Sequence, residues 1–144
     1  MWFYRRKKRR VRKRQSTKHY LAHKEMTRGF VHERLALYNV HYNFSYKRVF
    51  IKNQKSCWGS CSERGNLNFN YKLVFLSSHL ADYVIVHELC HLAELNHSPR
   101  FWSLVAEACP EYKKCRKELK TIRVTAARPL LSHRLHPLFL QALS

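Results

Sequence analysis

The chain is 144 residues long, enough for one domain with a modest core, and 45% of its residues are hydrophobic. No uninterrupted apolar run approaches the roughly 18 to 20 residues of a membrane span, and the N-terminus lacks the apolar core of a signal peptide. The sequence therefore predicts no membrane segment and a cytoplasmic location. The five cysteines are an odd number without a disulfide-framework spacing, which fits a reducing compartment.

Much of the formal net charge of +19 lies in residues 1–18, which are predicted to form a basic N-terminal tail. This segment holds ten Lys or Arg and no acid. Such a block repels itself, so we expect it to be disordered or to lie along a polyanion such as nucleic acid. A solvated tail with no specific partner is the alternative. The candidate nucleic-acid contacts are Arg5, Arg6, Lys7, Lys8, Arg9 and Arg10.

The next segment, from about residue 18 to residue 40, has an approximate apolar stripe that predicts a long helix, with Ser16 or Thr17 as its N-cap. Segments 46–53 and 67–71 are rich in β-forming or alternating residues and predict two strands. A polar turn precedes the second strand, which predicts a small antiparallel sheet or hairpin.

Three further helices are predicted after the sheet. The first covers about 79–95 and is apolar nearly all round in its first half, as expected of a central buried helix. The second covers 99–109, with Ser98 as its N-cap, and the third covers 111–120. Periodicity fades afterwards, so 121–144 are assigned to a C-terminal tail of unknown role. Together these elements predict an α+β fold.

An HExxH motif, His-Glu-Leu-Cys-His, begins at His87. His87 and His91 lie one turn apart on one face of a helix, where both imidazoles can reach the same ion. Glu88 flanks that face, so its carboxylate can address a metal-bound water without being a ligand. His97 can join them only if the helix ends first, and Asn96 tolerates the left-handed conformation used at helix C-termini. We therefore predict three histidine ligands and Glu88 as the general base.

The predicted ligand set indicates a catalytic zinc site. Three neutral imidazoles leave one tetrahedral position of Zn²⁺ open for water, which distinguishes catalytic from structural sites. Zinc lowers the pKa of that water toward about 7, and the resulting hydroxide attacks a polarised carbonyl or phosphoryl centre. We expect one zinc ion and a hydrolytic reaction.

The spacing from His87 to His97 equals that of metzincin peptidases, but two features exclude that family. Glu94 stands where metzincins have a turn-forming glycine. Both methionines, Met1 and Met26, precede the motif, so no Met-turn can follow it.

Several further motifs, in this order and spacing, accompany the histidines. They are Lys55-Ser56-Cys57-Trp58-Gly59-Ser60-Cys61-Ser62, Gly65-Asn66-Leu67-Asn68-Phe69-Asn70, Asp82-Tyr83-Val84-Ile85-Val86-His87-Glu88-Leu89-Cys90-His91, Asn96-His97-Ser98, Phe101-Trp102 and Pro110-Glu111-Tyr112-Lys113. With them the chain closely resembles the YgjP-like metal-dependent hydrolases, relatives of the SprT-like and WLM zinc metallopeptidases. The resemblance covers about residues 20–120. One departure is Cys57, which stands where family members usually carry Arg.

The resemblance implies a minigluzincin-like zinc metallopeptidase domain over 19–120, in which a small antiparallel sheet packs on the active-site helix between flanking helices. It implies zinc bound by the three histidines, Glu88 as the catalytic base, and a strand edge that binds an extended substrate. The run from residue 58 to residue 61 is either a packed turn or a substrate-binding loop. The candidate substrate contacts are Trp58, Gly59, Ser60, Asn68 and Asn70.

Three functions fit these features. The first is a zinc metallopeptidase acting on peptides or proteins. The second is a zinc hydrolase of nucleotides or other phosphate-containing substrates, since zinc hydroxide chemistry permits it and basic residues near the motifs could hold anions. The third is a basic module tethered to nucleic acid, in which zinc only braces the fold. Zinc ligands specify how water is activated, not what it attacks, so the substrate stays open.

Overall fold

The computed structural model describes the backbone of residues 2–127 and the side chains of residues 17–127. Helices and strands are mixed along the chain, which confirms the predicted α+β class. The elements are α1 (Trp2–Tyr42), β1 (Arg48–Lys52), β2 (Gly59–Cys61), β3 (Asn66–Asn70), the 3₁₀ helix η1 (Tyr71–Phe75), α2 (Ser78–Cys90), α3 (Pro99–Ala108) and α4 (Tyr112–Thr121).

The sheet has three strands in the order β1-β3-β2 and is mixed rather than antiparallel throughout. β2 and β3 form an antiparallel hairpin, closed by the predicted polar turn, in which Gly65 has a φ of 75°. β2 itself was not predicted, because its residues were expected to form a turn or a loop. β1, however, pairs with β3 in parallel. Alternation of side chains is the same for a strand of either direction, so the sequence pattern predicts β1 and β3 but not that they run parallel.

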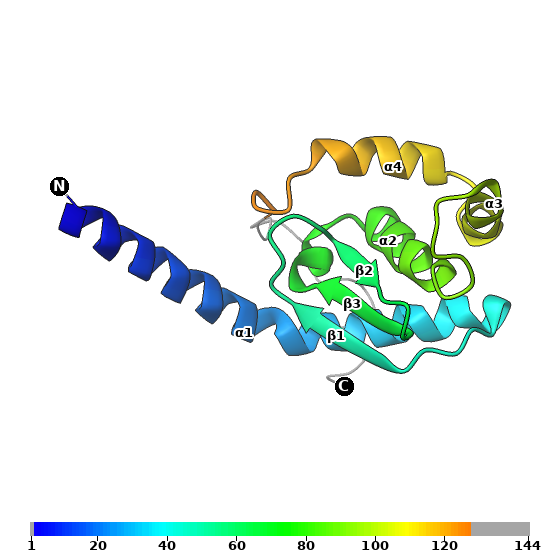
Figure 1. Cartoon of the computed structure of the whole chain (residues 1–144), viewed down its shortest axis with the longest axis horizontal. Helices are drawn as coiled ribbons and strands as arrows, with labels where there is room; N and C mark the ends of the chain where they lie inside the picture. The colour runs from blue at the N-terminus through cyan, green and yellow to red at the C-terminus, as the bar shows by residue number, and fades with distance from the viewer. Residues whose placement is uncertain (1, 128–144) are drawn as a thin grey trace, which may run out of the picture.

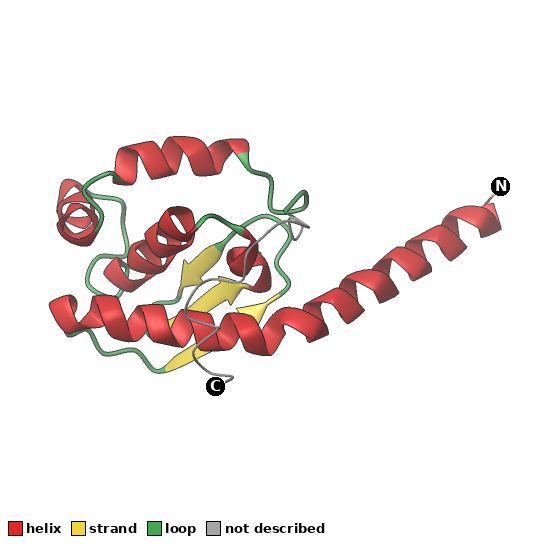
Figure 2. Cartoon of the chain, turned by 180° about the vertical axis from the view of Figure 1, so that it is seen from behind, coloured by secondary structure: helices red, strands yellow, loops and turns green. Residues whose placement is uncertain are grey.

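Helix α1 begins at Trp2, so the predicted N-cap at Ser16 or Thr17 is wrong. No Gly or Pro interrupts residues 2–28, and Lys and Arg are good helix formers, so the helix continues through the basic segment. The C-terminal half of α1 lies against the sheet and α2, while the N-terminal half projects from the body of the molecule (Figures 1 and 2). The basic segment is thus a helical extension of the domain.

The contacts of α1 with the body are both apolar and polar. Val31 and Leu35 are fully buried. Thr27 Oγ1 donates to Tyr71 O at 2.7 Å, which joins the helix to η1. Arg34 Nε lies 3.3 Å from Asp82 Oδ1 and joins it to α2. α1 therefore forms one wall of the core through its C-terminal half.

Helix α2 is the centre of the fold, as its apolar sequence predicts. It contacts α1, β2, η1, α3 and α4. Its buried side chains point to every side of the helix axis, which is typical of a helix without a solvent-facing stripe; they are Leu80, Ala81, Tyr83, Val84, Ile85, Val86, Glu88, Leu89 and Cys90.

The segment after α4 belongs to the folded body as far as residue 127. Val124 is buried, and its carbonyl accepts a hydrogen bond of 2.7 Å from Lys72 Nζ. The first residues of the predicted C-terminal tail therefore pack on the core, and the remainder, 128–144, lies outside the described residues.

No helix in the described part of the chain has the length and apolar character needed to cross a bilayer.

Candidate active site

The three predicted ligands converge at the C-terminal end of α2. His87 Nε2 lies 3.2 Å from His91 Nε2 and 3.1 Å from His97 Nε2. Two nitrogens bound to one tetrahedral zinc at about 2.0–2.1 Å are roughly 3.3–3.4 Å apart, so these separations fit a shared ion. Among the described residues, this is the group of His, Cys, Asp and Glu side chains whose ligand atoms gather closely enough to hold a metal.

The chain leaves α2 earlier than predicted. The helix ends at Cys90 instead of about residue 95, with His91 as its C-cap. Tight turns follow, in which Leu92 N donates to Leu89 O and Ala93 N to Cys90 O, each at 3.1 Å. Among the described residues other than glycine, a positive φ is found at Asn43. Asn96 therefore has a negative φ and does not adopt the left-handed conformation. Right-handed turns thus bring His97 back to the other ligands.

His97 is held by the start of the next helix. Ser98 is the N-cap of α3, and its Oγ accepts a hydrogen bond of 3.2 Å from Phe101 N, as predicted. The Phe101 ring is fully buried, with its centroid 4.9, 4.4 and 4.9 Å from those of His87, His91 and His97. A single core aromatic therefore supports all three imidazoles.

Local contacts also favour the protonation state that binds metal. Burial, and then the neighbouring imidazoles, lower the pKa of His87 to about 3, and burial lowers the pKa of His91. His91 Nδ1 lies 3.0 Å from Glu94 O, and a carbonyl can only accept, so Nδ1 carries the proton and Nε2 keeps its lone pair. His87 and His91 are thus held as neutral imidazoles, and the Nε2 atoms of all three histidines lie close together.

Glu88 lies behind the histidines and is almost completely buried, with 6% of its surface exposed. Burial raises the pKa of its carboxyl group to about 8. Gly59, at the start of β2, packs directly on it: a Cβ at that position would lie 2.7 Å from Glu88 Cγ and 2.8 Å from Oε1. Only a glycine leaves room for the carboxylate in this position.

The predicted substrate residues divide into two groups. Gly59 and Ser60 lie on β2, the edge strand nearest α2, and Trp58 directly precedes it. Asn68 Nδ2 donates to Ser60 Oγ at 3.2 Å across the hairpin. Asn70 is fully buried and donates to the carbonyls of Gln54 and Cys57 at 2.8 and 3.0 Å. Asn70 therefore holds the loop before β2, and its burial argues against the predicted contact with substrate.

Two residues beside the site were not predicted. Tyr83 OH lies 3.5 Å from His87 Nδ1, one helical turn away, and the i, i+4 spacing could have identified it. The guanidinium of Arg116, on α4, lies 4.9 Å from the centroid of Trp102, which stacks on His97. No local signal in the sequence links Arg116 to the histidines.

The predicted nucleic-acid contacts are far from this site in the chain. Arg5, Arg6, Lys7, Lys8, Arg9 and Arg10 lie on the N-terminal part of α1, and their side chains are outside the described residues.

Comparison with the solved structure of abylysin supports the expected minigluzincin-like fold. The zymogen of the metallopeptidase abylysin from Pyrococcus abyssi matches with a TM-score of 0.58 and 22% identity, over 70% of this chain and 99% of that chain. The zymogen of the metallopeptidase jannalysin from Methanocaldococcus jannaschii matches with a TM-score of 0.49 and 25% identity, over 67% of this chain and 97% of that chain.

Comparison of the sequence with known families gives a match over most of the chain. A search of curated proteins finds no significant match. The family model of the YgjP-like metallopeptidase domain matches residues 2–122, which include both the C-terminal half of α1 and all of the candidate site. The chain therefore belongs to the YgjP-like metallopeptidase domain family.

Proposed function

We propose that this chain is a zinc-dependent metallopeptidase, in which His87, His91 and His97 hold the metal and Glu88 is the general base. The observation that carries the proposal is the convergence of three Nε2 atoms beside a buried carboxylate. Nε2 of His87 lies 3.2 Å from that of His91 and 3.1 Å from that of His97. Membership of a metallopeptidase family supports peptide-bond hydrolysis as the reaction.

The donor set fits zinc better than other abundant divalent ions. Imidazole nitrogens suit zinc, whereas Mg²⁺ and Ca²⁺ prefer oxygen ligands. Three ligands gather among residues 17–127, and structural zinc sites are usually closed by four. A three-ligand set favours catalysis over the hypothesis of a zinc that only braces the fold.

Glu88 and β2 supply the remaining parts of the proposed mechanism. When bound, zinc would polarise the substrate carbonyl and lower the pKa of water at the site. Glu88 accepts the proton of the attacking water and afterwards donates it to the leaving amine. One edge of β2 (Gly59–Cys61) pairs with β3 and the other is free of the sheet, so an extended peptide can pair there in register with the base.

Substituting Glu88 by glutamine tests the proposal. We expect Glu88→Gln to keep about one zinc per chain, because Glu88 is not a ligand, while peptide cleavage falls by a factor of about 100 or more. Zinc content is measured by elemental analysis and cleavage by the release of fluorescence from quenched peptides. Glu63→Gln, in the exposed turn between β2 and β3, is the matched control and should retain full activity.

The same assay distinguishes the proposed peptidase from the alternative function, a hydrolase of nucleotides or other phosphate-containing substrates. Lys55, Lys120 and Arg123 lie around a pocket near the site, and such cations could also hold phosphate groups. Nucleoside triphosphates are therefore included as substrates. Hydrolysis of nucleotides but not of peptides by the wild-type protein, lost in Glu88→Gln, would replace the peptidase proposal by the phosphate hydrolase.

A further inference from the structure

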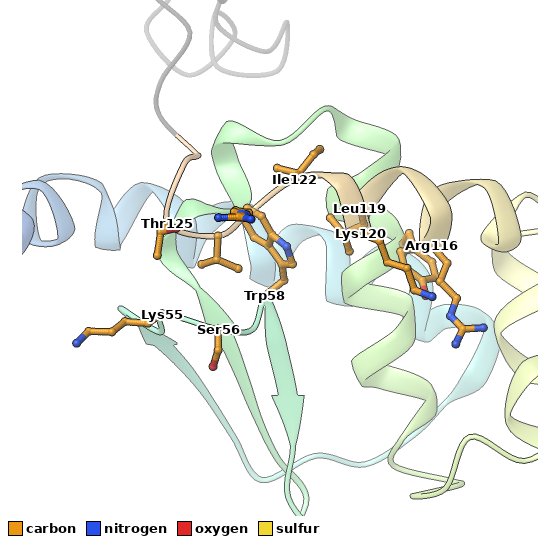
Figure 3. A pocket seen from close by; sticks show the side chains of 11 residues that line it. Lys55, Ser56, Trp58, Arg116, Leu119, Lys120, Ile122 and Thr125 are labelled. Carbon is orange, nitrogen blue, oxygen red and sulfur yellow. The ribbon is translucent and has the colours of Figure 1, made fainter.

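A pocket of about 470 Å³ adjoins the metal centre (Figure 3). Tyr83, one of its lining residues, places a hydroxyl 3.5 Å from His87 Nδ1. Trp58, another lining residue, directly precedes Gly59, the residue that packs on Glu88. The pocket therefore begins where the free edge of β2 meets the proposed catalytic groups.

The lining of the pocket combines an apolar floor with a cationic rim. Trp58 and Tyr83 are mostly buried and expose only small parts of their rings. Lys55, Arg116, Lys120 and Arg123 also line the pocket and are exposed, and none of its eleven lining residues is an Asp or Glu. Figure 3 shows Lys55 and Arg116 on opposite sides of Trp58. Such a lining attracts a group that is negatively charged at its tip.

The charges of this rim are not compensated by a nearby carboxylate of α4. Glu118, on the same helix, pairs with His79 at 3.1 Å and does not line the pocket. The wall that carries Arg123 is also fixed to the body, because Val124 is buried and its carbonyl is bonded to Lys72 Nζ. The cations therefore line an open pocket, one wall of which is fixed to the body of the protein.

We infer that this pocket is a subsite for an acidic side chain of the substrate, so that the enzyme prefers peptides with Asp or Glu close to the scissile bond. The inference rests on the proposed peptidase function. A peptide paired with β2 over Glu88 advances about 3.3 Å per residue, so a side chain one or two positions from the reacting carbonyl reaches the Trp58 end of the strand. Its carboxylate then meets the lysine and arginine side chains of the rim.

Matched peptides test the preference. A cleavable peptide is prepared with Glu, Gln or Lys at each position flanking the scissile bond, and kcat and KM are measured separately. At one position we expect kcat/KM for Glu to exceed that for Gln about tenfold, mainly through KM, and the difference to shrink with added salt. Equal kcat/KM values for Glu and Gln peptides at every position would overturn the inference and leave the peptidase proposal intact.

Neutralising the net charge of the rim should remove the preference for Glu while cleavage of the Gln peptide continues, a pattern that loss of folding cannot mimic. The variant Lys120→Glu/Arg123→Glu has no net charge on the rim and should cleave the Glu and Gln peptides with equal kcat/KM, while Lys117→Glu, an exposed change on the same helix outside the pocket, should behave as wild type. An unchanged preference for Glu in the double variant would contradict the assignment.

Binding without turnover provides an independent readout. Fluorescence anisotropy of labelled peptides with the Glu88→Gln protein should show tighter binding of the Glu peptide than of the Gln peptide, and the double variant should abolish the difference. Equal binding of the two peptides would refute the subsite. If the wild-type protein hydrolyses nucleoside triphosphates but no peptide, both the subsite and the peptidase proposal fail.

Discussion

The position of the proposed base depends on a glycine from a different part of the chain. Gly59 lies on β2 and Glu88 on α2, and the carboxylate occupies the space that a Cβ of residue 59 would take. β2 places the edge of the sheet, and α2 places the proposed base and two of the proposed ligands. Their close contact sets the distance between the edge of the sheet and the proposed base.

Replacement of Gly59 by alanine should therefore damage catalysis without removing the metal. The added methyl group has to displace Glu88, and a misplacement of about 1 Å can cost up to about 100-fold in rate, so we expect kcat/KM to fall about 10- to 100-fold. Zinc content should stay near that of the wild type, since the three histidines are untouched. Unchanged activity in Gly59→Ala would show that Glu88 is free to move.

Gly29 provides the matched control for this substitution. It lies within α1 and is exposed, and a Cβ there would meet nothing within 4 Å. Gly29→Ala should keep full activity and increase the free energy of unfolding by about 0.5–1 kcal/mol, because alanine is the better helix former.

Residues whose roles depend on local spacing could be predicted from the sequence, and those that depend on tertiary packing could not. His87, Glu88 and His91 follow from the periodicity of one helix, and His97 from the need for a turn. The packing of Gly59 on Glu88 and the approach of Arg116 to Trp102 join distant segments, so no pattern within either segment indicates them.

At the scale of elements, α1 and α2 are joined by a polar contact within their apolar interface. Arg34 Nε lies 3.3 Å from Asp82 Oδ1, with 13% and 20% of the two side chains exposed. Burial, and then the charge of Asp82, raise the pKa of Tyr38 to about 12, which places this hydroxyl in the same group of side chains. The contact fixes α2, and with it the metal ligands, against the long helix.

Removal of one partner of this pair should destabilise the protein. Asp82→Ala leaves Arg34 mostly buried without the carboxylate, and we expect the free energy of unfolding to fall by about 2 kcal/mol, between the values for exposed and fully buried pairs. Denaturation by urea measures the change. The exposed pair of Arg28 and Glu25 is the control, since Glu25→Ala should change stability by less than about 0.5 kcal/mol. Equal effects of the two substitutions would contradict this view of the interface.

Element boundaries could be predicted where the sequence contains a stop signal. The helices α3 and α4 agree with their predicted ranges within one residue, because Ser98-Pro99 and Pro110 mark their ends. The end of α2 was predicted too late, because residues 92–94 are good helix formers and only the return of the chain to the site ends the helix. The start of α1 was predicted too late because a capping residue can also lie inside a helix.

At the scale of the whole molecule, the basic segment is separated from the candidate active site. The ten Lys and Arg of residues 1–18 lie on α1, whose N-terminal half projects away from the domain that carries the histidines (Figure 1). A polyanion bound there would leave the site accessible. That the extension tethers the protein to nucleic acid stays a prediction, and it is independent of the reaction.

Deletion of residues 2–14 tests the tethering hypothesis. The full chain should bind single- or double-stranded DNA with an affinity that falls steeply with salt, because each cation that neutralises a phosphate releases a counterion. The deletion should lower both the affinity and the slope of its salt dependence, whereas cleavage of a short neutral peptide should stay the same. Equal DNA binding by the two proteins would exclude the extension as a nucleic-acid tether.

The three proposed metal ligands lie in one short stretch of chain, residues 87–97, while the glycine that packs on Glu88 comes from the sheet. Histidines one helical turn apart can chelate zinc before the rest of the protein has folded. If zinc is the metal, we expect it to bind the unfolded chain as well, so that it stabilises the native state by less than its affinity for that state implies. The proposed base, in contrast, is confined by Gly59 only when β2 packs on α2, so we expect binding of the metal and correct placement of the base to be separate steps of folding.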